Sequence, residues 1–221
     1  MTENRNTVVT ISRQFSCGGA YIGHLVAKKL GYKFAEREVL YRAAGELGID
    51  IPEAAKLDEC CSGLVANLMK SFIYGAPEAV YYPPSRRPVY DEELFQTECR
   101  IMKAIADQFN AVIIGHCGFS VLRDHPWVLH VFIHAPMEFR IKRHQQFHKV
   151  TTEQARDDIE ESDRRREKFI RKMAGSDRYD ARNYHLSIDA QAAGFEAAQQ
   201  IIVELVEKMN RDKEARRPDR E

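Results

Sequence analysis

Residues 8–19 read VVTISRQFSCGG, a β-branched run that passes into a polar loop closed by two glycines. The run at 8–11 has the composition of a buried strand. After the loop, apolar residues recur at helical spacing up to Gly31, and glycine is typical of helix ends. These apolar residues are Ile22, Leu25, Val26 and Leu30. The segment therefore predicts a strand, a glycine-rich loop and a helix, in that order.

The rest of the chain alternates between strand-like and helix-like segments. Short apolar runs predict further strands at 33–35, 112–115, 129–133 and 185–188. Apolar spacing and capping residues predict helices at about 38–47, 64–72, 91–109, from 136 onward, 151–173 and 194–209. This alternation favours an α/β fold with a mostly parallel sheet and helices on both faces.

Two helices carry clear apolar stripes, and their members are expected to face the core. In the helix at 91–109 they are Leu94, Phe95, Ile101, Met102, Ile105 and Phe109. In the last helix they are Ile201, Ile202 and Leu205.

The length of 221 residues predicts one domain, 1–221, with a small insertion. The insertion is expected at about 50–90, where glycines, prolines and tyrosines interrupt any regular pattern. Residues 210–221 are almost all charged and are expected to form a disordered tail.

The composition narrows the classes of partner. A formal net charge of zero argues against nucleic acid or a membrane surface as the main partner, while anionic substrates such as nucleotides remain possible. The five cysteines fit no zinc or disulfide spacing, which favours reduced thiols. The N-terminus lacks the apolar run of a signal peptide, and no apolar stretch is long enough to span a membrane. A cytoplasmic protein is therefore expected.

The loop at 13–20 invites comparison with phosphate-binding loops of the form G-x-x-x-x-G-K-S/T. It reads RQFSCGGA, so Gly18 matches the second glycine of that form. Gly19 stands at the lysine position, and Ala20 stands at the hydroxyl position. By itself the loop also fits a plain strand-to-helix turn.

A series of short segments carries a resemblance over nearly the whole chain, except about 60–90. In order they are TISRQFSCGG (10–19), LGYKF (30–34), DEELF (91–95), VIIGHC (112–117), VLRD (121–124), VFIHAP (131–136), RIKR (140–143), DRRR (163–166) and NYHLSI (183–188). Together they resemble the cytidylate-kinase-like family, whose opening typically reads ISRQFGSGGR.

The resemblance implies a three-layer P-loop fold like that of nucleoside-monophosphate kinases. Such a fold has a five-stranded parallel sheet with the loop-bearing strand in the centre. It also implies a helical lid at about 137–175 and an acceptor-binding region at about 50–90. The implied activity moves the γ-phosphoryl group of ATP, with Mg²⁺, to CMP or dCMP. Nucleotides are the implied partners, and a homo-oligomer is possible.

On the donor side, the backbone of the loop would hold the phosphates, since loop N–H groups and a helix N-terminus attract anions. The residues concerned are Ser16, Cys17, Gly18, Gly19, Ala20 and Tyr21. Arg13, at the entrance of the loop, could reach an anion, or it could form a salt bridge at the strand end. Cys17 is interpreted as a small residue that fills space.

In the lid region, Arg140 and Arg143 stand three residues apart and share one helix face. The resemblance implies that they cover the transferring phosphoryl group, for which a guanidinium is well suited. Asp163, with Arg165 or Arg166, resembles a pair that contacts the acceptor nucleotide. For both groups the alternative is an exposed helix face that mixes acids and bases.

On the acceptor side, the resemblance implicates Arg37, Arg42 and His116. His116 follows a strand end, a common ligand position in α/β sheets, although it could equally be a loop histidine without a role. The family usually has arginine at positions 20 and 116, and the absence of both weakens the case for efficient CMP phosphorylation. No metal ligand is predicted.

Three hypotheses remain open from the sequence. The first is a kinase of CMP or a related nucleotide. The second is a kinase of the same fold with another small acceptor. The third is a nucleotide-binding or regulatory protein that has lost catalysis, which the missing lysine and arginines favour.

Overall fold

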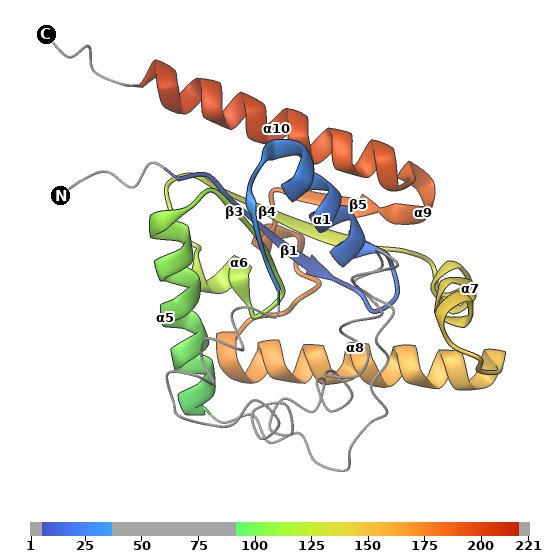
Figure 1. Cartoon of the computed structure of the whole chain (residues 1–221). Coiled ribbons are helices and arrows are strands. Elements are labelled where there is room, and N and C mark those ends of the chain that lie inside the picture. Colours follow the sequence, from blue (N-terminus) through green and yellow to red (C-terminus); the bar gives the residue numbers. More distant parts are fainter. Residues whose placement is uncertain (1–5, 37–91, 217–221) are drawn as a thin grey trace, which may run out of the picture.

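The computed structural model describes residues 6–36 and 92–216, and strands and helices alternate along them as the sequence predicts (Figure 1). In chain order the elements are β1 (Val8–Arg13), α1 (Gly19–Leu30), β2 (Lys33–Ala35), α5 (Glu92–Gln108), β3 (Ala111–Ile114), α6 (Gly118–Val121), β4 (Val128–His134), α7 (Met137–Phe147), α8 (Thr152–Ala174), η1 (Ala181–Asn183), β5 (Leu186–Asp189), α9 (Ala190–Ala193) and α10 (Phe195–Ala215).

The sheet has five strands in the order β2-β3-β1-β4-β5, and every described pair is parallel. β1 lies in the centre, where Val8 pairs with Ala111 of β3 and with Val128 of β4. The prediction of a parallel α/β sheet with the loop-bearing strand in the middle is confirmed. Burial on both faces explains why these strands read as continuous apolar runs.

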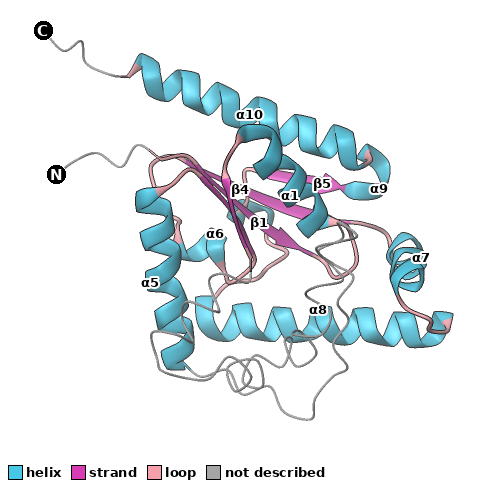
Figure 2. Cartoon of the chain, viewed as in Figure 1, coloured by secondary structure: helices cyan, strands magenta, loops and turns pink. Residues whose placement is uncertain are grey.

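Helices cover both faces of the sheet and make three layers (Figure 2). On one face Val9 and Ile11 of β1 pack with Val26 of α1 and Ile202 of α10. On the other face Val8 packs with Ile105 of α5. Successive side chains of β1 therefore serve opposite layers, as the two-residue period of a strand requires.

The predicted helix ends are largely confirmed. Gly31 ends α1 in the left-handed region at φ 67°. Thr151 and Gln154 form the reciprocal capping box that starts α8, and Gly175 ends that helix. These helix ends can be predicted from the sequence because each depends only on a side chain and the backbone of the same turn.

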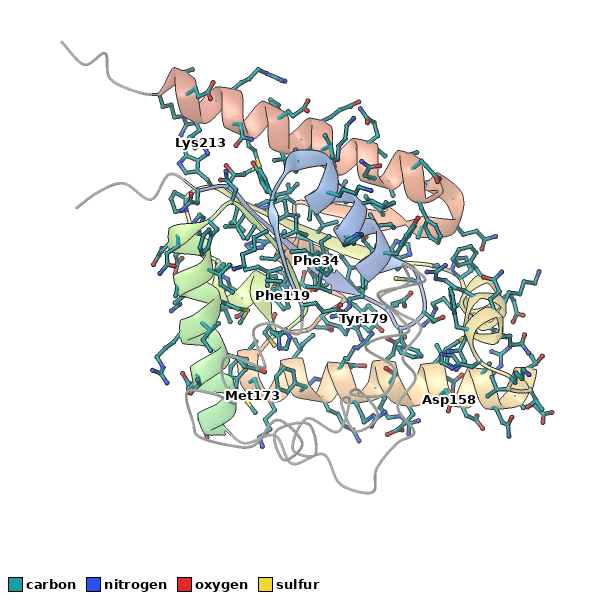
Figure 3. All side chains as sticks on the ribbon, in the orientation of Figure 1. Phe34, Phe119, Asp158, Met173, Tyr179 and Lys213 are labelled. Carbon is teal, nitrogen blue, oxygen red and sulfur yellow. The ribbon has the colours of Figure 1, made fainter. Side chains whose placement is uncertain are left out.

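Three details of the sequence interpretation are wrong. Phe109 and Ile201 are each 40% exposed rather than inward-facing. The expected tail begins too early, because α10 continues to Ala215. Lys213 holds its last turns by donating to the Thr7 hydroxyl across 2.7 Å, and it is seen beside the start of β1 in Figure 3.

Other predictions lie outside the described residues. These are the helices at 38–47 and 64–72, the insertion at about 50–90 and the last residues of the tail. Within the part of the chain that the structure describes, no helix combines the length and apolar character needed to cross a membrane.

Candidate functional site

The loop between β1 and α1 lies at the edge of the sheet where the parallel strands end. Gln14 fixes the start of this loop to the end of β4. The Gln14 N–H donates to the Ile133 carbonyl at 3.0 Å, and the Gln14 side-chain oxygen accepts from the Ala135 N–H at 3.1 Å. The neighbouring strands β1 and β3 lead to helices on opposite faces, α1 and α6. Crevices at such a position are the usual ligand sites of open α/β sheets.

The loop has the backbone conformation of a tight cradle. Ser16 and Gly18 adopt positive φ angles of 61° and 91°. Gly18 must lack a side chain, because a Cβ there would lie 2.5 Å from the Phe195 ring at the start of α10. α1 begins immediately afterwards, so its N-terminal dipole points into the loop.

The other loop residues behave as packing residues. Cys17 is fully buried, and its Sγ donates to the Ile133 carbonyl at 3.4 Å, as expected of a space-filling residue. Ala20 is also fully buried. Tyr21 meets Phe195 edge-on, with ring centroids 5.6 Å apart.

Arg13, the last residue of β1, forms an ion pair in this structure. Its Nη2 lies 3.0 Å from Glu36 Oε1, beyond the end of β2. On the way its guanidinium passes over Gly115, where any Cβ would collide with Nη1. The salt bridge considered for Arg13 is therefore present, and it places a cation across the carboxyl end of β3.

Asp163 of α8 is the centre of a buried ionic cluster. Its carboxylate accepts the Phe15 N–H at 2.8 Å, Arg140 Nη1 at 2.6 Å and Arg178 Nη1 at 3.3 Å. The side chains of Arg140 and Arg178 are only 7% and 1% exposed. One carboxylate thus ties the loop to α7, α8 and the segment after α8.

Two further arginine contacts close the loop from the same side. Arg178 and Arg166 both donate to the carbonyl of Arg13, and the Arg166 guanidinium lies 5.3 Å from the centre of the Phe15 ring. Among the described residues of this cluster, four guanidinium groups face two carboxylates, those of Glu36 and Asp163. The excess of positive charge favours anions at the loop.

The structure buries two residues predicted for the lid region, Arg140 and Asp163, and their predicted contacts with nucleotide stay predictions. Arg140 is buried and pairs with Asp163. Asp163 is likewise buried, and its oxygens accept hydrogen bonds from the loop and from two arginines. The sequence does not predict this pairing, because a helix pattern cannot show which charged residue on one helix meets which on another.

Arg143 and Arg165, two other arginines predicted for the lid region, have contacts that differ from those of Arg140. Arg143 is half-buried, with its guanidinium 4.8 Å from the centre of the Phe195 ring and 5.2 Å from that of Phe147. Since Phe195 also touches Gly18, Arg143 lies near the rim of the loop. Arg165 stands 3.8 Å from Glu161 on its own helix.

His116 bridges three elements beyond the end of β3. Its Nε2 lies 3.0 Å from the Glu36 carbonyl oxygen, and its Nδ1 lies 3.3 Å from Glu98 of α5. Both partners are acceptors, so the doubly protonated ring can donate to each. These contacts show that His116 links neighbouring elements, and its predicted contact with an acceptor stays a prediction. Arg37 and Arg42 lie outside the described residues.

Three residues of the site were not found from the sequence: Arg178, Glu98 and Phe195. Arg178 follows Gly175 in a segment without periodicity, and Glu98 reads as one more polar residue of an amphipathic helix. Phe195 only marks the start of the last helix. No sequence signal distinguishes them, because each acts through a partner far away in the chain.

The site offers little protein ligation for a metal ion. Within residues 6–36 and 92–216, no three His, Cys, Asp or Glu side chains are placed to hold one. Position 20, where phosphate loops carry a hydroxyl for Mg²⁺, is a buried alanine. The carboxylates described near the loop already have cationic partners: Glu36 pairs with Arg13, Glu98 with His116, and Asp163 with Arg140 and Arg178.

Comparison with known proteins places this geometry in context. A model of the cytidylate kinase-like family matches residues 8–192. An uncharacterized protein from Eubacterium ventriosum ATCC 27560 superposes with a TM-score of 0.67 at 16% identity, covering 91% of this chain and 99% of that one. No curated protein matches the chain.

Two named kinases are more distant structural matches. A shikimate kinase from Bacteroides thetaiotaomicron has a TM-score of 0.49 at 12% identity, over 91% of this chain and 98% of that one. A gluconokinase from Sinorhizobium meliloti 1021 has a TM-score of 0.46 at 13% identity, over 95% and 98% of the two chains.

Proposed function

Because the chain belongs to the cytidylate kinase-like family, we propose that it is an ATP-dependent phosphotransferase whose acceptor is CMP, dCMP or a related nucleotide. In this reaction the bond between the γ-phosphorus and the bridging oxygen of ATP breaks as an acceptor phosphate oxygen bonds to that phosphorus. ADP leaves with the electron pair. The observation that carries the proposal is that guanidinium groups outnumber carboxylates around the loop between the central strand and the N-terminus of α1.

Phosphoryl transfer asks a protein mainly for positioning and for positive charge. The loop backbone, with positive φ angles at Ser16 and Gly18, forms the cradle for the phosphates. The N-terminus of α1 adds the positive end of its helix dipole. Arg166 and Arg143 line the two sides of this loop, over Phe15 and Phe195 respectively. We assign to them the predicted contact with the transferring phosphoryl group.

Asp163 and Arg140 serve as positioning residues in this proposal. Their ion pair of 2.6 Å fixes the loop backbone through the Phe15 N–H. A preorganised cradle does not have to reorganise when charge develops, which is the main source of electrostatic catalysis.

Magnesium fits the site only through the phosphates. When bound, it would neutralise charge on the phosphate oxygens. With alanine at position 20, it would be held by the nucleotide and by water, which Mg²⁺ readily retains. The protein's own contribution is then the arginine charge.

The acceptor side is assigned to the residues beyond β2 and β3. His116 lies there between the Glu36 carbonyl and the Glu98 carboxylate. Arg37 and Arg42 remain predicted acceptor contacts. Another small acceptor is compatible with the same donor loop.

A second candidate is a nucleotide-binding or regulatory protein without turnover. The specific observation that favours it is the buried Ala20 together with Gly19, which removes both the hydroxyl and the lysine of ordinary phosphate loops.

The test is ADP formation from ATP and Mg²⁺ with a panel of nucleoside monophosphates at high enzyme concentration. Turnover highest with CMP or dCMP would support the proposal, and turnover with only a different acceptor would overturn its specificity. Thermal shift separates the second candidate. A catalytic kinase is stabilised by donor and by acceptor, whereas a protein that responds to only one nucleotide, or to neither, fits the non-catalytic role.

A further inference from the structure

We propose that Arg13 supplies the cation that phosphate loops of the G-x-x-x-x-G-K-S/T form carry at their lysine position. This inference rests on the proposed function, because it assigns a role toward the phosphates of ATP. In that form the first glycine falls at position 13 and the lysine at position 19. This chain has arginine at 13 and glycine at 19, so the small residue and the cation have exchanged places.

The exchange is visible as a steric relation between the two positions. A Cβ built on Gly19 would lie 2.6 Å from the Cβ of Arg13 and 3.1 Å from its Cγ. Real Cβ atoms do not approach other carbons so closely, so the side-chain space beside position 19 is filled by the stem of Arg13. Only one of the two positions can carry a long side chain.

The charge at the end of that stem lies at the ligand edge of the sheet. The guanidinium passes over Gly115 at the end of β3 and reaches Glu36 at 3.0 Å. The side chain of Arg13 is 17% exposed, and so is that of Glu36. The side chain thus extends from the end of β1 across the end of β3 to the residue after β2, and its charge remains within reach of solvent.

Glu36 acts as a holding partner in this arrangement. A guanidinium binds a phosphate with the same planar fork that it presents to a carboxylate. Arg13 can therefore exchange the Glu36 carboxylate for a phosphate oxygen without changing its protonation. The alternative is a purely structural ion pair at the strand end, in which the charge of Arg13 does nothing for nucleotide binding.

A reciprocal swap of the two residues separates these readings. The variants are Arg13→Gln, Arg13→Gly, Gly19→Lys and the double variant Arg13→Gly with Gly19→Lys. The matched control is Arg13→Ala with Gly19→Lys, which removes the guanidinium but keeps the residue-13 Cβ that a Cβ at position 19 would meet at 2.6 Å. For each we would measure the dissociation constants of ATP and of tripolyphosphate by calorimetry, ADP formation, and the melting temperature.

Arg13→Gln keeps most of the stem, so it should fold and yet lose turnover by about 100-fold, the usual effect of removing one positioned charge-stabilising group. Its affinity for tripolyphosphate should fall together with that for ATP. Gly19→Lys alone should lower the melting temperature, because two side chains compete for one space. The swap with glycine at position 13 should restore phosphate binding and at least 10-fold of the lost turnover, while the alanine control should not.

Two results would overturn the inference in different ways. If the wild-type protein binds ATP but Arg13→Gln binds tripolyphosphate equally well, Arg13 is a structural residue while the proposed function stands. The same conclusion follows if the folded glycine swap performs no better than Arg13→Gly. If the wild-type protein binds neither ATP nor tripolyphosphate, the proposed function itself fails, and the role of Arg13 fails with it.

Discussion

Asp163 holds more of the site together than any neighbouring carboxylate that the structure describes. It accepts one loop N–H and two guanidinium groups while lying only 12% exposed as a side chain. A buried carboxylate between two arginines is weak evidence for net stability, since desolvation offsets much of the attraction. Removing it alone is costly, because both cations would stay buried without it.

Asp163→Asn should therefore destabilise the fold by about 3–5 kcal/mol, the usual cost of breaking a buried ion pair on one side. Urea unfolding measures this directly. The matched control is Asp180→Asn, which breaks an exposed ion pair with Arg182 and should leave the midpoint almost unchanged. Equal midpoints for both variants would show that the cluster is not an energetic unit.

Arg143 should behave in the opposite way. Arg143→Ala removes a stacked guanidinium worth about 0.5–1 kcal/mol at a partly exposed site, so the melting temperature should change little. Turnover should fall by about 100-fold if the residue stabilises the transferring phosphoryl group.

Steady-state kinetics would be compared with Arg156→Ala, which breaks an exposed pair with Glu138 between α7 and α8. Arg156→Ala should keep the wild-type rate. A large loss of stability in Arg143→Ala with unchanged turnover would identify Arg143 as a structural residue.

At the scale of elements, the sequence predicted what depends on local rules. β1, the loop and α1 follow from β-branched composition, two glycines and helical spacing, and the capping box of α8 from the spacing of Thr151 and Gln154. The central place of β1 follows from the family resemblance, whereas alternation predicts only that the sheet is mostly parallel. For the site, the sequence indicates the loop and several arginines, and their roles stay predictions.

What could not be predicted depends on contacts between distant elements. Nothing near Arg178 in the sequence indicates that it donates to Arg13, and nothing near Arg140 indicates its pairing with Asp163. The prediction that Phe109 faces the core is wrong for a different reason. Phe109 lies just past the end of α5, where the apolar stripe of the helix no longer applies. The charged composition of 210–221 predicts a tail, yet α10 continues to Ala215 because charge on an exposed face does not end a helix.

The capping box allows a prediction about a whole element. Thr151→Ala removes the hydroxyl that accepts the Gln154 N–H at 3.2 Å and should cost about 1 kcal/mol. Thr152→Ala, one residue further on, is the control because its hydroxyl only meets Gln145 at 3.5 Å.

Thermal unfolding of both variants measures the difference. The Thr151 variant should melt several degrees lower, by about 2–4 °C for a protein of this size. A loss as large in the control would show that the effect comes from changing the surface of α8 rather than from the cap.

At the scale of the whole molecule, a formal net charge of zero conceals an uneven distribution of charge. Arginines gather where the strands end, while α8 interleaves acids and bases along its outer face. Global charge therefore says little about the ligand, whereas local charge at the loop favours anions.

Buried histidines make the stability of the whole molecule depend on pH. Burial lowers the pKa of His130 to about 4, helped by the nearby charges of His185, Arg123 and His125. Burial also lowers the pKa of His148 to about 4, with His144 acting in the same direction and Asp158, labelled in Figure 3, opposing it. In the unfolded chain a histidine has a pKa of about 6.5, so between about pH 6.5 and 4 the unfolded state binds more protons.

The contribution of these histidines to the free energy of unfolding should therefore be largest above about pH 6.5, and it should fall as the pH drops toward 4. From pH 7 to pH 5 the loss should be about 2 kcal/mol for a buried histidine such as His130, and less for the half-buried His148. Urea titrations at half-unit steps measure this slope, and the window above pH 5 lies above the range in which most carboxylates titrate. His130→Gln and His148→Gln should each flatten the slope, and the double variant should flatten it most. A double variant that keeps the wild-type slope would assign the pH dependence to other groups, because glutamine cannot take up a proton in this range.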